Sequence, residues 1–262
     1  MKLLTLEHML LFSDQPRRLQ RFYEDLFGHR VTWASEAGDD PTWIHLTGGR
    51  SYLSIFRRRT DPPQAAGFQH MGWVVDDLPA FREHLAARGV TIHRDLVTRE
   101  ADHVYLYDPD RHEVELVHYH AGFASPSNPA SLLERLNHVR LTVADLAASV
   151  AFYTEVLGFG ATWLEPLAAA NRVHLHSSDS YLSLSLAAVD DGADDSGPPR
   201  TPRFLHAGWV AHSLPACQQQ LDDQQFPWSV GSGGSSARLY LHDSDGDPSA
   251  GPSIELSASS SS

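Results

Sequence analysis

Cysteine is nearly absent from this chain, and long apolar runs are missing altogether. The one cysteine, Cys217, excludes an internal disulfide and fits a reducing compartment, so a cytoplasmic location is expected. No apolar run approaches the roughly 18 residues that cross a bilayer. The first residues, MKLLTLEHMLLF, are typical of a strand rather than of a signal peptide. We therefore expect no membrane partner.

Positive charge is also scarce. Twenty Lys and Arg residues stand against 33 Asp and Glu residues, and the formal net charge of -13 argues against nucleic acid as a partner. The partner expected instead is a small-molecule substrate, and the sequence leaves homo-oligomerisation open. Histidine, by contrast, is abundant, with 16 residues in a chain of 262. That abundance favours metal chemistry.

The two halves of the chain repeat one another. LEHMLLF matches LNHVRLTV around His8 and His138, and FQHMGWVV matches FLHAGWVA around His70 and His206. VEL at Glu115 likewise matches IEL at Glu255. Two histidines and one carboxylate on one face of a divalent metal leave positions open for substrate or dioxygen. The candidate metal ligands are therefore His8, His70 and Glu115 in the first half, and His138, His206 and Glu255 in the second.

Each half divides again into two modules of one layout. A strand leads through a capping residue into a short amphipathic helix, which three further strands follow. The pattern predicts an α+β fold with the order βαβββ four times over. The expected helix caps are Ser13 or Asp14, Asp76 or Asp77, Asp145, and Ser213.

Alternation along the strands predicts which way the ligands face. Met71, Trp73 and Val75 share a face that would pack on the helices, so His70 lies on the opposite face. Glu115 lies opposite its apolar neighbours in the same way. A buried carboxylate needs a partner, and a metal ion would be one.

The expected domains follow the repeat. An N-terminal domain covers residues 1–120, with modules 1–62 and 66–120, and a linker covers 121–134. A C-terminal domain covers 135–257, with modules 135–189 and 203–257, and a disordered tail covers 258–262. Modules could pair as first with second and third with fourth, or as first with fourth and second with third. The six ligands are the same either way.

These residues resemble the vicinal oxygen chelate superfamily, which includes glyoxalases, bleomycin-resistance proteins and extradiol ring-cleaving dioxygenases. The resemblance covers essentially the whole chain. FYEDLFG and FYTEVLGFG, HMGWVV and HAGWVA, and YLYDPDRHEVEL carry it. It implies βαβββ modules paired into half-barrel-like sheets, with a metal held in the concavity by the six ligands named above. The superfamily spans several reactions, so the fold alone does not select one.

Glyoxalase-type sites resemble His/Glu/His/Glu, with the extra glutamate on the last strand of the first module. This chain has Ser54 there and Ser183 at the matching place in the second half. A serine cannot replace that carboxylate as a base, so ordinary glyoxalase chemistry is disfavoured.

Extradiol dioxygenases use the His/His/Glu triad with Fe(II) or Mn(II), and have a tyrosine ten residues before the glutamate. Tyr105 stands ten residues before Glu115, whereas Tyr240 stands fifteen before Glu255 because the second turn is longer. The acid–base histidine of these enzymes is missing from SYLSIF and SYLSLSL. His45 and His174, on neighbouring strands, are the possible substitutes.

The function expected from this resemblance is extradiol-type cleavage of a catechol-like aromatic diol, with Fe(II) as the metal and Mn(II), Zn(II) and Ni(II) as alternatives. Two other functions stay open. One is a glyoxalase-like lyase, isomerase or thiol transferase, and the other is a metal-free protein that binds a small molecule in resistance or regulation. Tyr105 and the intact DPD turn favour the first half as the working centre, without excluding the second. Three other histidines, His84, His93 and His112, are expected at the surface.

Overall fold

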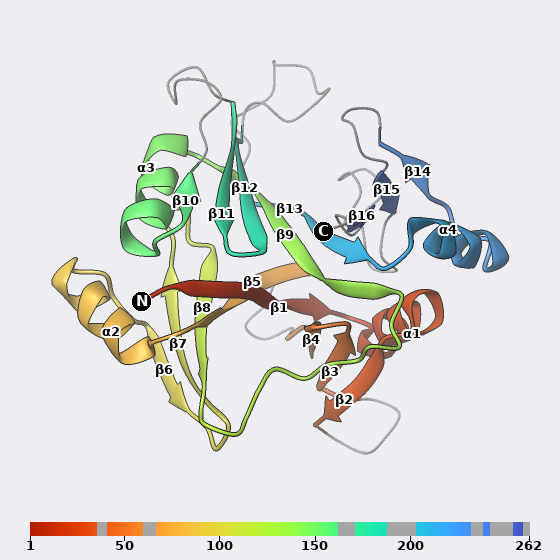
Figure 1. The fold of residues 1–262 in the computed structure, drawn as a ribbon, viewed down its shortest axis with the longest axis horizontal. Helices are drawn as coiled ribbons and strands as arrows, with labels where there is room; N and C mark the ends of the chain where they lie inside the picture. Colours follow the sequence, from red (N-terminus) through yellow and green to blue (C-terminus); the bar gives the residue numbers. More distant parts are fainter. Residues whose placement is uncertain are drawn as a thin grey trace. The chain divides into compact units, whose positions relative to one another are not determined.

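A computed structural model describes residues 1–35, 41–59, 67–161, 171–187, 203–231, 238–241 and 254–258. Within these residues the order βαβββ occurs four times, as predicted, and can be followed by colour in Figure 1. The first half contains β1 (Leu3–Ser13), α1 (Pro16–Phe27), β2 (Arg30–Ala34), β3 (Trp43–Gly48), β4 (Ser51–Arg57), β5 (Gly67–Val75), α2 (Leu78–Ala87), β6 (Arg94–Val97), β7 (Ala101–Tyr107) and β8 (Glu113–Tyr119).

The second half repeats this order. Its third helix continues into a short π-helical stretch, η1. The elements are β9 (Leu133–Val143), α3 (Leu146–Ala151), η1 (Phe152–Val156), β10 (Gly160–Ala161), β11 (Arg172–Ser177), β12 (Ser180–Leu186), β13 (Phe204–Ala211), α4 (Leu214–Asp223), β14 (Ser229–Val230), β15 (Arg238–Leu241) and β16 (Ile254–Ala258).

The strands form two eight-stranded mixed sheets, one from each half. Their orders are β2-β3-β4-β1-β5-β8-β7-β6 and β10-β11-β12-β9-β13-β16-β15-β14. The opening strand of each module pairs in parallel with the closing strand, as β5 does with β8, and the other pairs within a module are antiparallel. In the sheets, modules therefore pair first with second and third with fourth. The chain consists of two similar α+β domains, and their predicted boundaries remain a prediction.

The chain also packs into two compact units, which do not coincide with the halves of the sequence. One contains residues 1–6, 70–124 and 138–205, and the other contains 7–69, 125–137 and 206–262. In the first unit Trp73 packs edge to face on Phe159, with ring centroids 4.9 Å apart. In the second, Phe22 packs in the same manner on Phe226, at 5.2 Å. Aromatic pairs of this geometry add stability beyond the burial of their area.

Three of the four helices begin where the sequence predicts. The side chain of each cap accepts a hydrogen bond from a backbone N–H three residues on, for Asp77, Asp145 and Ser213. The prediction for α1 was wrong, because this helix begins after Gln15 without a side-chain cap. The Ser13 hydroxyl accepts from the Gln15 N–H, and Asp14 is held by the Arg58 guanidinium at 2.6 and 2.8 Å. Neither is left to cap the helix.

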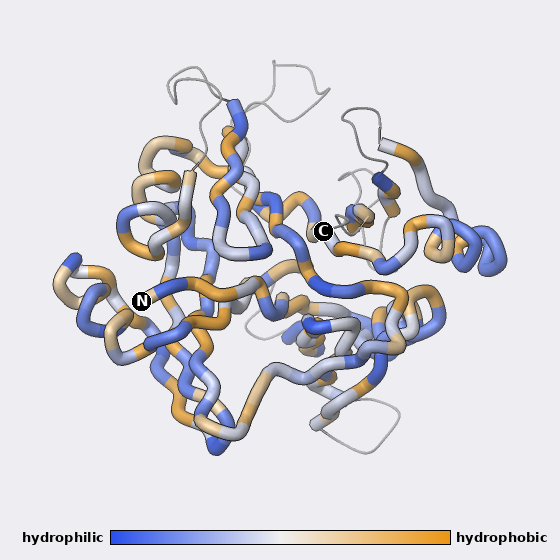
Figure 2. Tube along the Cα trace, in the orientation of Figure 1, coloured by the Kyte–Doolittle hydropathy of each residue, from blue (hydrophilic) through white to orange (hydrophobic). Residues whose placement is uncertain are grey.

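The apolar strand faces are buried as predicted. Met71, Trp73 and Trp209 are 0% exposed. Cys217 is also buried, and burial raises the pKa of its thiol to about 11, which suits a structural residue rather than a nucleophile. Short apolar and polar stretches alternate along the trace in Figure 2. None of the helices in the described part is long and apolar enough to cross a membrane. Of the expected tail 258–262, Ala258 lies at the end of β16, and residues 259–262 lie outside the described residues.

Candidate metal centres

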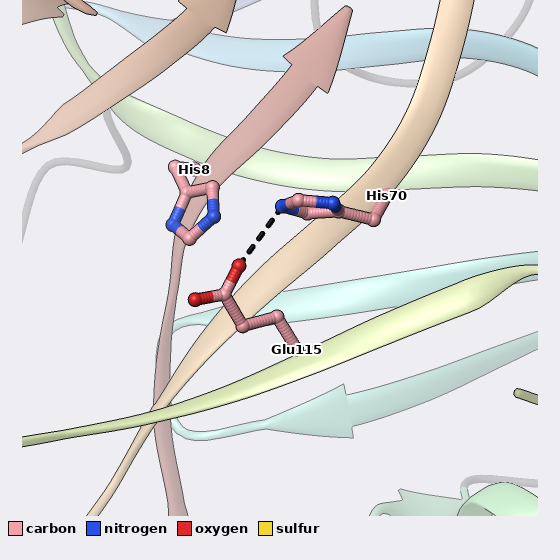
Figure 3. A group of neighbouring side chains, drawn as sticks. All are labelled: His8, His70 and Glu115. Carbon is pink, nitrogen blue, oxygen red and sulfur yellow. Dashed lines mark ion pairs between the residues drawn. The ribbon is translucent and has the colours of Figure 1, made fainter. Parts of the chain in front are cut away.

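The structure brings the six predicted ligands together as two groups. Within each group, one possible ligand atom per residue lies within 4.8 Å of the others, and every member is buried. Figure 3 shows the first group, with His8 on β1, His70 on β5 and Glu115 on β8. The second group contains His138 on β9, His206 on β13 and Glu255 on β16.

The donor set of the first group fits a divalent metal. Two ligand atoms that occupy neighbouring coordination positions, each about 2.1 Å from the same ion, lie about 3 Å from each other. His70 Nε2 and Glu115 Oε2 are already 2.9 Å apart. Two neutral imidazoles and one carboxylate suit Fe(II), Mn(II) or Zn(II) without selecting among them.

Carboxylates also orient both histidines of the first group. Glu7 Oε2 lies 3.1 Å from His8 Nδ1, and Glu113 Oε2 lies 3.1 Å from His70 Nδ1. A carboxylate on Nδ1 fixes the tautomer that presents a bare Nε2 to a metal and makes that nitrogen more basic. Glu7 and Glu113 were not predicted as site residues. The signal for Glu113 is that it alternates with Glu115 on β8, so both point to one face.

Two further histidines lie beside the first group, and the sequence did not place them there. His103 Nδ1 lies 2.7 Å from Glu115 Oε1, and His93 Nε2 lies 2.8 Å from Glu113 Oε1. His93 is exposed, as expected, although its ring also meets Glu113. The same expectation was wrong for His112, which is buried.

Tyr105 lies directly across from Glu115 on the paired strands β7 and β8. Burial, and then the charge of Glu115, raise the pKa of its hydroxyl well above the ordinary value, so the group keeps its proton. The Arg94 guanidinium lies 3.5 Å above the centre of the ring. Tyr105 is therefore a buried, protonated hydroxyl beside the triad.

The second half preserves this pairing despite its longer turn. Tyr240 lies across from Glu255, and its hydroxyl donates to Glu255 Oε2 at 3.0 Å. Burial and the charge of Glu255 raise the pKa of Tyr240. The two tyrosines are therefore structurally equivalent, although their distances in sequence from the glutamate differ.

A group of aromatic side chains extends the face that carries His8, and we call it the aromatic wall. Its members, connected by ring contacts and strand pairing, are Phe12, Trp33, Trp43, Tyr52 and Phe56. Tyr52 stacks on His8 at 4.6 Å, and Trp43 stacks on Phe56 at 4.5 Å. Such rings offer flat apolar surface to an aromatic molecule.

His45 belongs to this wall rather than to the ring of groups around the ligands. It lies 4.9 Å from Trp43 and 5.1 Å from Tyr52, between ring centroids. Its strand partner is Ser54, whose hydroxyl accepts a hydrogen bond from Trp43 Nε1 at 2.7 Å. At the position where the resemblance to glyoxalases implies a glutamate, this chain therefore has Ser54, whose hydroxyl holds the indole of Trp43 by a hydrogen bond.

Among the described residues, the matching surface of the second half is more polar. Tyr181 stacks on His138 at 4.4 Å, as Tyr52 does on His8. By strand pairing, however, Thr142, Arg172 and Ser185 take the places of Phe12, Trp43 and Phe56. His174, the counterpart of His45, is exposed. The two halves therefore share a triad and differ in what surrounds it.

Comparison with known proteins agrees with the fold. The profile of the "Glyoxalase/Bleomycin resistance protein/Dioxygenase superfamily" matches residues 5–116 and 135–250. No curated protein matches the sequence. Among solved structures, the Mn(II)-bound glyoxalase from Novosphingobium aromaticivorans is 16% identical with a TM-score of 0.71, over 98% of this chain and 82% of that one.

Two dioxygenases are similar to the same degree. The 2,3-dioxygenase LapB from Pseudomonas sp. KL28 is 16% identical with a TM-score of 0.71, over 98% of this chain and 93% of that one. The 2,2',3-trihydroxybiphenyl 1,2-dioxygenase from Sphingomonas wittichii strain RW1 is 20% identical with a TM-score of 0.68, over 98% and 91%. At such identities the likeness establishes the fold and not the reaction.

Proposed function

Since the chain belongs to the glyoxalase, bleomycin-resistance and dioxygenase superfamily, we propose that it is a metal-dependent dioxygenase that cleaves a catechol-like aromatic diol. The observation that carries this proposal is the aromatic wall beside a His/His/Glu triad, with His8 shared by both through its stacking on Tyr52. A flat aromatic diol would find ring contacts on the wall and metal coordination at the triad. The solved dioxygenases of the same fold support the proposal.

The working centre in this proposal is His8, His70 and Glu115, and Fe(II) is the first metal to test. When bound, such an ion would hold the two vicinal oxygens of the diol and bring dioxygen to the same site. Tyr105 would donate a hydrogen bond from its hydroxyl to a substrate oxygen, since its raised pKa keeps the group protonated. The aromatic wall would orient the ring and exclude water from it.

His45 is the candidate for moving a proton between solvent and substrate, because it lies among the wall residues that would face the ring. His174 holds the corresponding place in the second half, where it contacts Tyr181 at 5.3 Å between ring centroids, but it is exposed and its strand neighbours Arg172 and Ser185 replace Trp43 and Phe56. The proposal therefore expects His45→Ala to lower kcat much more than His174→Ala does. A general acid or base contributes roughly 100- to 10,000-fold to a rate, which sets the scale of the loss.

The test is oxygen uptake, together with the absorbance of ring-cleaved products, by protein reconstituted anaerobically with Fe(II) or Mn(II). Catechol and its 3- and 4-alkyl or aryl derivatives are the substrates, and His70→Ala is the inactive control. Uptake matched by ring-cleaved product would support the proposal. Metal bound without uptake on any diol would refute it and favour the glyoxalase-like alternative, for which the Mn(II)-bound glyoxalase of the same fold is the precedent. Absence of bound metal after loading would favour a small-molecule-binding protein.

A further inference from the structure

The two triads differ most at one position of the strand that faces the ligand glutamate. His103 on β7 and Arg238 on β15 each lie two residues before the tyrosine that faces the ligand glutamate of their half. The strand pairings place His103 across from Val117 and Arg238 across from Ser257, so the two residues are structurally equivalent. Both side chains reach the ligand glutamate.

The chemistry at this position is opposite in the two halves. His103 Nδ1 lies 2.7 Å from Glu115 Oε1, and an imidazole can be neutral and can itself bind a metal. Arg238 Nη1 lies 3.3 Å from Glu255 Oε1, and a guanidinium keeps its charge at any pH a protein tolerates. Because the Tyr240 hydroxyl donates to Oε2, both oxygens of Glu255 are bound to donors of this chain.

The surroundings strengthen the difference. Around the first triad, Glu7 and Glu113 add two carboxylates to that of Glu115. In the second half, Asn137 precedes His138 where Glu7 precedes His8, and residue 253 is a serine where the first half has Glu113. The equivalent positions thus hold three carboxylates in one half, against a single carboxylate paired with a guanidinium in the other. A divalent cation is attracted to the first set and competes with a fixed cation at the second.

From this arrangement we infer that Arg238 takes the place of the metal in the second triad, so that only the first triad loads a divalent ion. Arg238 neutralises the buried Glu255 as a metal would, and the second half keeps its fold without one. This inference rests on the proposed function only for the first triad. The prediction for Arg238 does not depend on the proposed function, because it concerns only the exclusion of a metal ion from the second triad.

The test is metal stoichiometry rather than activity. Chelator-stripped protein is dialysed against Co(II), and bound cobalt is measured by mass spectrometry and by its visible absorption. We expect about one equivalent per chain in the natural protein, lost in His70→Ala and retained in His206→Ala. Arg238→His, which copies the first half, should acquire a second equivalent, with a gain in affinity of about 10- to 100-fold at that site. The double variant Arg238→His with His206→Ala should lose it again.

Two controls separate charge from shape. Arg238→Lys keeps a cation beside Glu255 and should stay at one equivalent, whereas the reciprocal variant His103→Arg should lose cobalt from the first triad. Circular dichroism establishes that each variant is folded. Two equivalents in the natural protein, or no second equivalent in folded Arg238→His, would overturn the inference. If the natural protein bound no cobalt while Arg238→His bound one, the proposed function would fail and the inference about Arg238 would stand.

Discussion

His29 is a buried histidine whose protonation opposes folding, and its removal should change how stability depends on pH. The residue is 4% exposed and lies against Tyr23, Phe27 and Trp209, with ring centroids 5.2 to 6.3 Å away. Neither ring nitrogen has a hydrogen-bond partner among the described residues. Burial lowers the pKa of this imidazole from 6.5 to about 3.

The sign of the effect follows from proton binding. Below pH 6.5 the unfolded chain binds a proton at His29, whereas the folded protein does not bind it until the pH falls to about 3. The contribution of neutral His29 to the free energy of unfolding is therefore fully present above pH 6.5. It is lost progressively as the pH falls from 6.5 towards 3. At pH 5 the loss is about 2 kcal/mol, and it reaches about 5 kcal/mol below pH 3.

The perturbation is His29→Leu, which keeps an apolar side chain in the site and removes the titrating group. The free energy of unfolding would be measured by urea denaturation at pH 8 and pH 5, with a chelator present so that metal binding does not contribute. The natural protein should lose about 2 kcal/mol more than His29→Leu between these pH values. His212→Leu, at an exposed position, is the matched control. Equal losses in the natural protein and in His29→Leu would refute the reasoning.

Three other substitutions test particular contacts. Glu113→Gln should weaken metal binding about 10- to 100-fold in calorimetric titration. Unchanged affinity would show that the Glu113 carboxylate does not orient His70 for metal binding. Asp108→Ala removes the acceptor of a buried tyrosine hydroxyl, an imidazole and two backbone N–H groups, and should lower the free energy of unfolding by roughly 2–4 kcal/mol in urea. Gly49→Ala places a Cβ against the Glu134 carbonyl at positive φ, so it should lower the thermal midpoint far more than Gly122→Ala, which has positive φ and open space. Equal thermal midpoints for Gly49→Ala and Gly122→Ala would contradict the expected clash with the Glu134 carbonyl.

The fold could be predicted from the sequence because its signals are local and repeated. Strand alternation and helical periodicity recur four times, and each recurrence supports the others. The helix caps show where this kind of inference stops. Asp77 caps its helix as its chemistry suggests, whereas Asp14 is taken by Arg58, which lies 44 residues away in the sequence. A local sequence pattern cannot show that a residue distant in the sequence will bind the side chain expected to cap a helix.

The candidate site shows the same division. The ligands could be named because both halves retain them, but their orienting groups are not retained and so gave no repeat to detect. The alternation of Glu113 with Glu115 along one strand is a signal in the sequence, whereas His103 becomes visible only when the pairing of β7 with β8 sets it on the face of Glu115. The aromatic wall likewise depends on the registers of β1, β3 and β4. Register fixes which residues share a face, and it is a property of the folded sheet.

Divergence between the halves has a physical limit, which the buried glutamates set. Glu115 and Glu255 are each 3% exposed, and a carboxylate so far from water needs a cation or several hydrogen bonds. A duplicated metal site cannot simply lose its metal, because the uncompensated charge would then oppose folding. The second half meets this requirement with Arg238 and Tyr240, which bind Glu255 directly. The first half adds two further carboxylates and has a histidine where Arg238 stands, so its charge balance favours a bound divalent ion.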